Sequence, residues 1–207
     1  MERTRSKGET RTLASTIEKI KQLREETAAG MMDVKRALDE SGGDVEGARK
    51  VLRERGQAIA AKKSSRAATE GLIDAYVHFN GRVGVLVEVN CETDFVARTP
   101  EFKEFVRDVA LHVASMRPLC VAPEDLPAGA VEEERAVIEK QVAEMGKPEN
   151  ISKQITEGRM RKWVSEQALL TQPFVKDTDK TVGDLLQDTI QKVGENVVVR
   201  RFVHYEL

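Results

Sequence analysis

The sequence predicts an α+β fold, with an N-terminal bundle of three short helices followed by a small antiparallel sheet packed with helices. Two β-branched runs, 71–79 and 82–89, flank an Asn-Gly pair, which is the strongest short-range signal of a β-hairpin. Apolar residues at helical spacing occur before and after these runs. A last β-branched run at 197–203 supplies a third strand, which we expect to join the hairpin.

Length and composition are typical of a folded protein with a highly charged surface. The chain has 207 residues, of which 40% are hydrophobic and 33% are charged. No apolar run approaches the roughly 20 residues that a membrane-spanning helix needs. The first residues lack the apolar stretch of a secretory signal, and two cysteines are too few for a disulfide framework. We therefore expect a cytoplasmic protein that makes no contact with a membrane.

The charge is distributed unevenly along the chain. The net charge of −2 argues against a nucleic acid as the partner. Residues 1–66 carry 16 Lys and Arg against 11 Asp and Glu, a net charge of +5. Residues 67–207 carry 17 Lys and Arg against 24 Asp and Glu, a net charge of −7. The chain therefore has a basic part followed by an acidic part.

Turn and cap residues divide the basic part into elements. Residues 1–14 are expected to form a flexible extension, and 15–56 a three-helix domain. The first helix should run to about Glu26, and the second should end before Gly42. The signals are a capping box at 15–18, an apolar stripe of Met31, Val34, Ala37 and Leu38, a cap at Asp44 and a closing Gly56.

A linker or connecting helix is expected at 57–69, where Ala, Lys and Ser dominate, and an α+β core domain at 70–207. Asn80 and Gly81 are expected to supply the positive φ angles of a type I′ turn. The remaining expected elements are a helix opened by Thr99 and Pro100 with Phe102, Phe105, Val106, Val109 and Val113 on one face, helices at 130–145 and 149–170, and a last helix from Thr181 to Gly194.

The chain shows no catalytic or nucleotide-binding constellation. It has neither a Gly-x-x-x-x-Gly-Lys-Ser/Thr loop nor a Gly-x-Gly-x-x-Gly after a strand. Its cysteines and histidines lack metal-ligand spacing, so partly buried thiols and surface histidines are expected instead. We predict a protein that is not an enzyme and that holds no metal and no cofactor. An enzyme built on Cys91 is a distant alternative.

One aromatic residue stands in a connector. Residues 91–98 follow a predicted strand and precede the helix that begins near Pro100, which puts Phe95 between the two elements. Because loops mostly show polar faces, an aromatic side chain flanked by Asp94 and Arg98 is a candidate contact point for a partner. The alternative is that Phe95 fills the core of its own domain, and spacing does not decide between the two.

Two adjacent methionines mark the turn before the second helix. Neighbouring side chains on a helix point in different directions, so Met31 and Met32 cannot both face one core. The two methionines directly follow Gly30, and one of the two is a candidate adaptable contact for a partner. The alternative is one core methionine and one incidental surface methionine.

Four segments of the chain are distinctive in sequence. They are TAAGMMDVKRAL at 27–38, EVNCETDFVAR at 88–98, QPFVKD at 172–177 and GENVVVRR at 194–201. In this order they resemble the bacterial elongation factor Ts family, the exchange factors of elongation factor Tu. The resemblance covers about residues 15–207. Ala28 stands where the family usually has glycine, and little effect is expected, because a helical end tolerates alanine.

The resemblance implies a mechanism of nucleotide exchange. The three-helix bundle would be a ubiquitin-associated-like domain that docks on elongation factor Tu, with Gly30, Met31 and Met32 as its contact residues. A second segment would enter near the partner's magnesium site, displace Mg²⁺ and promote GDP release, with Phe95 as a wedge. This role is implied for Thr93, Asp94, Phe95 and Val96.

The resemblance is to the short family members, in which one copy of the core sheet is present in each chain. It therefore implies a homodimer, which we expect to be non-covalent because no cysteine lies near the C-terminus. The main alternative from another class is an adaptor, since three-helix bundles of this kind also bind ubiquitin-like partners. An adaptor would not need the segments at 93–98 and 172–177.

Overall fold

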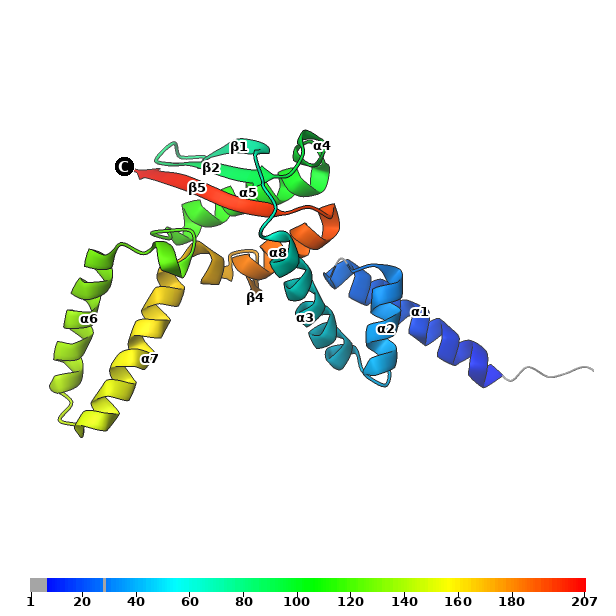
Figure 1. Cartoon of the computed structure of the whole chain (residues 1–207), viewed down its shortest axis with the longest axis horizontal. Coiled ribbons are helices and arrows are strands. Elements are labelled where there is room, and N and C mark those ends of the chain that lie inside the picture. Colours follow the sequence, from blue (N-terminus) through cyan, green and yellow to red (C-terminus); the bar gives the residue numbers. More distant parts are fainter. Residues whose placement is uncertain (1–6, 28) are drawn as a thin grey trace, which may run out of the picture. The chain divides into compact units, whose positions relative to one another are not determined.

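In a computed structural model, the chain has the α+β fold that the sequence predicts (Figure 1). The structure describes residues 7–27 and 29–207, with side chains from residue 16 onward. Two units are formed, and each is described by itself. Unit 1 covers Met1–Ala67 and Gln187–Asn196, and unit 2 covers Ala68–Leu186 and Val197–Leu207.

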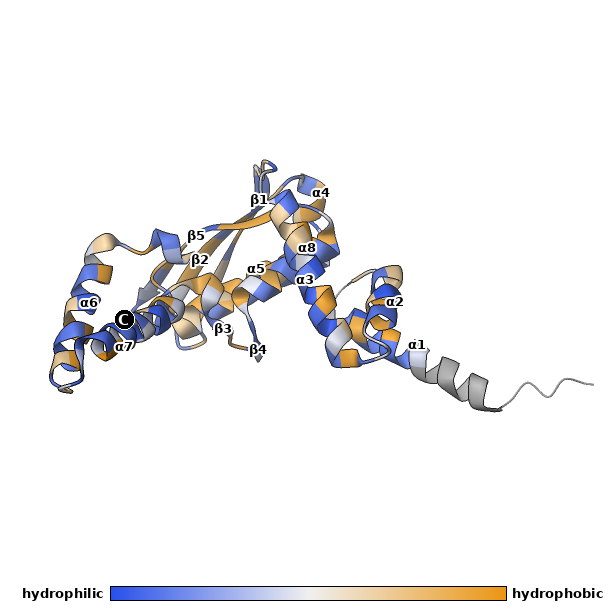
Figure 2. Cartoon of the chain, turned by 60° about the horizontal axis from the view of Figure 1, so that its bottom comes forward, coloured by the Kyte–Doolittle hydropathy of each residue, from blue (hydrophilic) through white to orange (hydrophobic). Residues whose placement is uncertain are grey.

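Unit 1 contains the predicted three-helix bundle. Its helices carry apolar and polar residues on different faces, and the apolar faces meet in one core (Figure 2). The core consists of Leu23, Ala29, Val34, Ala37, Leu38, Ala48 and Leu52, with Ile20, Val45 and Val51 packed against it. The helices are α1 (Lys7–Thr27), α2 (Met31–Glu40) and α3 (Val45–Lys63).

Two helix boundaries in unit 1 differ from the prediction. The first helix begins at Lys7, well before Ser15, so the expected cap at 15–18 lies inside α1. The third helix does not close at Gly56 but continues to Lys63, since residues 57–63 (QAIAAKK) are strong helix formers that tolerate one internal glycine. Gly56 is buried, and a Cβ there would lie 3.2 Å from Gln191 Oε1. Ala28 lies outside the described residues.

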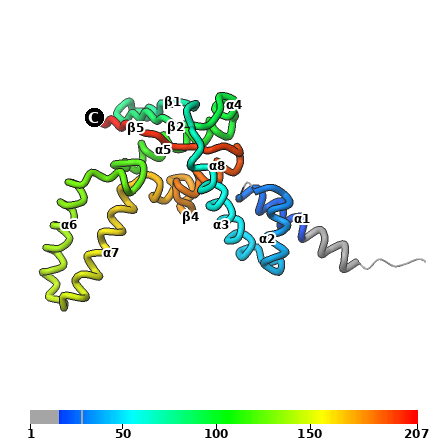
Figure 3. The backbone as a smooth tube through the Cα atoms, in the orientation of Figure 1, coloured from blue at the N-terminus to red at the C-terminus, as the bar shows by residue number. Residues whose placement is uncertain are grey.

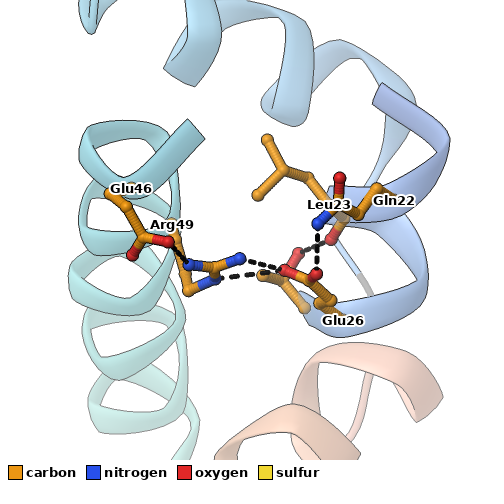
Figure 4. Close-up of polar contacts among 6 residues, drawn as sticks. Gln22, Leu23, Glu26, Glu46 and Arg49 are labelled. Atoms are coloured by element: carbon orange, nitrogen blue, oxygen red, sulfur yellow. Dashed lines mark hydrogen bonds and ion pairs between the residues drawn. The ribbon is translucent and has the colours of Figure 1, made fainter. Parts of the chain in front are cut away.

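Asp44 caps α3 as predicted, since its side chain accepts a hydrogen bond from the Gly47 N–H. One turn further along, Arg49 links α3 to α1 by donating to Glu26 Oε2 at 2.7 and 3.1 Å, and it also pairs with Glu46 (Figure 4). Bonds to Glu46 and Glu26 raise the pKa of Arg49, which therefore stays charged.

Unit 2 is built on a three-stranded antiparallel sheet in the order β1-β2-β5. The C-terminal strand joins the hairpin as predicted, with β2 in the centre. On one face, called the inner face, Val85, Val87 and Val89 are buried under α5. The opposite, outer face carries exposed apolar residues. The strands are β1 (Glu70–Val77), β2 (Val83–Cys91) and β5 (Val197–Glu206).

The hairpin turn is not the predicted type I′ turn. His78 pairs with Val83, and the Gly81 N–H donates to the His78 carbonyl at 2.8 Å, so the connection is four residues long. Gly81 has a φ of +67°, but Asn80 does not have a positive φ, and a type I′ turn needs both. The Asn-Gly signal therefore located the hairpin correctly but not its turn geometry.

The helix α5 (Pro100–Met116) matches the prediction closely. The Thr99 side chain accepts the Phe102 N–H, Pro100 is in the first turn, and the predicted apolar face is buried on the sheet. The helix ends at Arg117, which adopts a left-handed conformation with φ +52° before Pro118.

The predicted helical hairpin follows, and the tube in Figure 3 traces its two arms. Ile138, Val142 and Met160 form a small core between the arms. The last helix is capped by reciprocal bonds between Thr181 and Asp184, as predicted. The elements are η1 (Pro123–Asp125), α6 (Ala128–Ala143), α7 (Glu149–Gln167), η2 (Leu169–Thr171) and α8 (Val182–Val193).

A small hairpin of β3 (Pro173–Phe174) and β4 (Asp177–Thr181) was not predicted. Its strands are too short and too polar to show alternation. Within the described part of the chain, no helix is long and apolar enough to cross a membrane.

Candidate functional site

The segment after β2 forms one turn of helix, α4 (Asp94–Ala97), which begins three residues after the last residue of the strand. Thr93 is extended, and its hydroxyl accepts the Val96 N–H at 3.4 Å, so the turn has its own N-terminal cap. The backbone closes the turn, because the Ala97 and Arg98 N–H groups donate to the carbonyls of Thr93 and Phe95, both at 3.3 Å. We call residues 93–98 the wedge turn.

Buried neighbours hold the wedge turn at both ends. At its start, the thiol of Cys91, a fully buried residue, donates to the Thr93 carbonyl at 3.1 Å. At its end, the Thr99 hydroxyl donates to the Val96 carbonyl at 2.8 Å while capping α5. Ala97 faces inward between these anchors. The wedge turn is therefore fixed to both the sheet and α5.

Phe95 is displayed on this turn with 77% of its surface exposed. Asp94 and Arg98 form an ion pair at 2.8 Å one helical turn apart, and both remain accessible. Of the two alternatives that spacing left open, the exposure of Phe95 excludes the one in which it fills the core of its own domain. A fixed, exposed phenylalanine loses little conformational entropy when a partner covers it.

The two methionines of α2 are both exposed, by 57% for Met31 and 64% for Met32. The prediction that Met31 continues the apolar stripe into the core is wrong, because the buried face of α2 begins one turn later, at Val34. Gly30 precedes the helix in extended conformation, and its carbonyl accepts the first helical N–H groups. Gly30, Met31 and Met32 therefore form an accessible apolar corner of unit 1.

The segment 172–177 is anchored by a buried histidine. His112 is fully buried, and its Nε2 lies 2.9 Å from Gln172 Oε1. The Val175 N–H donates to His112 Nδ1 at 3.2 Å, which fixes the proton on Nε2. Burial lowers the pKa of His112, so the ring is neutral at pH 7. The prediction of surface histidines is wrong for this residue.

Two further residues of the segment 172–177 contact residues of α5, one from a buried position and one from the surface. Phe174 is buried with its ring centroid 6.0 Å from that of His112. Lys176 points along α5 and pairs with Asp108 at 2.5 Å. The segment 172–177 is therefore attached to α5 by hydrogen bonds and an ion pair, which gives it a structural role. Neither cysteine forms a disulfide, and both are buried.

The family model described as Elongation factor TS matches residues 9–190 of the chain. The elongation factor Ts of Rubrobacter xylanophilus is 77% identical over 195 residues, which are 94% of this chain and 100% of that protein. The chain belongs to the elongation factor Ts family. Elongation factors Ts of Carboxydothermus hydrogenoformans and of a Thermoanaerobacter species are each 53% identical, over 93% and 90% of this chain and 88% and 92% of those proteins.

Membership of the elongation factor Ts family makes the chain a translation elongation factor of the nucleotide-exchange class. The exposed wedge turn and the methionine corner are both sequence segments that carried the resemblance. Among the described residues, no group of three or more His, Cys, Asp and Glu side chains is arranged to hold a metal ion.

The apolar outer face of the sheet was not predicted. The outer face of the sheet exposes apolar side chains from all three strands, and no described helix of unit 2 covers it. The sequence contains a signal for this face, because the strand runs place apolar residues on both faces of the sheet rather than on one. The outer-face residues are Ile73, Val77, Leu86, Val203 and Tyr205, with exposures from 37% to 69%.

Proposed function

We propose that the chain is the guanine nucleotide exchange factor of elongation factor Tu. It binds the GDP-bound partner in the cytoplasm, inserts residues Thr93 to Val96 near the partner's magnesium site, dislodges Mg²⁺ and promotes GDP release. The observation that supports this most strongly is Phe95, a large apolar side chain that is 77% exposed on a turn fixed at both ends. Such a side chain is suited to enter a cleft of another protein.

The physical basis of exchange is the sensitivity of Mg²⁺ to its surroundings. The ion demands near-ideal octahedral geometry and neutralises the phosphates of GDP, so a small displacement of its ligands weakens both the ion and the nucleotide. The coupling is reciprocal: the factor by which this chain lowers GDP affinity is the factor by which GDP lowers the affinity for this chain.

The magnitude requires more than one contact. A thousandfold faster release needs roughly 4 kcal/mol of differential binding, whereas burying one phenylalanine supplies about 1.5–3 kcal/mol. Contacts outside the wedge turn must supply the rest. The exposed corner of Gly30, Met31 and Met32 suits this role, because unbranched methionine side chains adapt to an uneven protein surface.

We also propose a non-covalent homodimer formed through the outer face of the sheet. Its exposed apolar residues surround one polar pair, in which Arg201 donates to Glu88 at 2.7 Å, and a second copy would cover them. Large exposed apolar patches on a folded protein mark association surfaces. Light scattering at micromolar concentration tests this proposal, and a monomer would contradict it.

The exchange activity is tested by release of fluorescent GDP from elongation factor Tu with and without the chain. We expect the rate of GDP release to rise with the concentration of the chain until the rate reaches a plateau. Unchanged release would overturn the proposal, and binding of a ubiquitin-like protein in the same preparation would favour the adaptor alternative instead.

A further inference from the structure

A charged cavity of about 490 Å³ lies along the first two turns of α5. Residues at helical spacing supply most of its lining, Arg98 of the wedge turn lies at one end, and Lys176 reaches in from the β3–β4 turn. We call it the α5 cavity. Its charged lining residues are Arg98, Lys103, Glu104, Arg107, Asp108 and Lys176.

The lining of the α5 cavity has more basic than acidic side chains, although residues 67–207 carry 17 basic and 24 acidic residues. Four basic and two acidic side chains line it, and one of the basic ones, Arg98, also pairs at 2.8 Å with Asp94 of the wedge turn. One carboxylate is already neutralised, since Asp108 is mostly buried and binds Lys176 at 2.5 Å. Lys103 forms no ion pair with any residue that the structure describes, and Arg107 lies 4.0 Å from Asp74 with 75% of its side chain exposed.

The α5 cavity is continuous with the wedge turn. Arg98 lines the cavity, and its backbone N–H donates to the Phe95 carbonyl at 3.3 Å. The next turn follows directly, because the Lys103 N–H donates to the Thr99 carbonyl at 3.2 Å. A protein that encloses Phe95 must therefore also lie against Arg98 and the mouth of the cavity.

We propose that the α5 cavity binds acidic groups on the surface of the same nucleotide-binding partner, beside the site that Phe95 enters. This inference rests on the proposed exchange function. A site that holds Mg²⁺ and a nucleoside diphosphate is surrounded by carboxylate and phosphate oxygens, which carry negative charge. Lys103 and Arg107 supply positive charge next to that region and attract the partner to the chain.

The contribution is electrostatic and differs from that of the wedge. Charges at the rim of an interface change association rate and salt dependence, and each exposed contact adds a modest part of the affinity. The cavity therefore controls how much of the chain is needed for half-maximal exchange. Phe95 controls the maximal rate of GDP release.

The test is the double variant Lys103→Gln/Arg107→Gln in the full chain, with elongation factor Tu loaded with fluorescent GDP. We expect the half-saturating concentration to rise about fivefold at roughly 0.05 M salt, with the maximal release rate changed less than twofold. The difference from wild type should shrink at about 0.5 M salt, because salt screens exposed charges.

The matched control is Lys153→Gln/Lys162→Gln, which removes the same charge from exposed positions on α7. An equal loss in both double variants, or no loss in the first, would overturn the assignment. A fall in the maximal rate alone would also overturn it, since that result assigns the residues to the wedge.

A different readout separates this proposal from the exchange function. Titration of nucleotide-free elongation factor Tu measures binding without any exchange step. If wild-type chain binds but does not accelerate GDP release, the exchange proposal fails. The same titration still tests the α5 cavity, because the Lys103→Gln/Arg107→Gln variant must then bind more weakly than its control.

Discussion

Replacing Phe95 by alanine removes the wedge while leaving its support in place. The turn is held by Cys91, Thr93 and Thr99 through bonds that do not involve the phenyl ring, so the backbone should keep its conformation. Full burial of a phenylalanine is worth about 1.5–3 kcal/mol. With 77% of Phe95 available for burial, the variant should lose about 1.2–2.3 kcal/mol of transition-state stabilisation, or roughly 8- to 50-fold in GDP release.

The assay is stopped-flow release of fluorescent GDP from elongation factor Tu at a saturating concentration of the chain. We expect slower release by Phe95→Ala with largely unchanged binding to nucleotide-free partner. The matched control is Phe79→Ala, which removes a phenylalanine that is 93% exposed at the tip of the β1–β2 hairpin and should leave release unchanged. Equal release by wild type and Phe95→Ala would refute the wedge.

Three further predictions concern stability and assembly. The free energy of unfolding should fall as pH drops below about 6.5, because burial lowers the pKa of His112 and unfolding lets the ring take up a proton. Urea titrations at a series of pH values should show that the free energy of unfolding depends less on pH in His112→Gln than in the wild type. Arg49→Met should destabilise unit 1 by only about 0.5–1 kcal/mol, since solvent screens the half-exposed pairs, and hydrogen exchange in α1 and α3 measures this. Leu86→Glu should convert the proposed dimer to a 23.1 kDa monomer in light scattering, and an intact dimer would exclude the outer face.

The elements that the sequence predicted correctly have local causes. The helix α5 follows from the cap at Thr99, Pro100 in the first turn and an apolar face at helical spacing, all of which lie within one segment. The connector that contains the wedge turn was located for a similar reason, because the strand pattern ends before Cys91 and the helix signal starts at Thr99. The segment between them had to connect the two elements.

The features that the sequence did not predict depend on the balance between competing local signals or on contacts between distant segments. The continuation of α3 through Gly56 depends on seven helix-forming residues that follow it, which outweigh the glycine as a stop signal. Exposure of Met31 depends on where the bundle core ends, which periodicity alone does not show. Burial of His112 depends on Gln172, which lies 60 residues further along the chain.

The most direct test of the account is the dependence of GDP release on magnesium. Release of fluorescent GDP from elongation factor Tu is measured with and without the chain, first at millimolar Mg²⁺ and then in EDTA. If the chain acts by dislodging Mg²⁺, its acceleration is large at millimolar Mg²⁺ and much smaller in EDTA, where the ion is already absent. An acceleration of the same size in both conditions would contradict a mechanism that acts through the magnesium site.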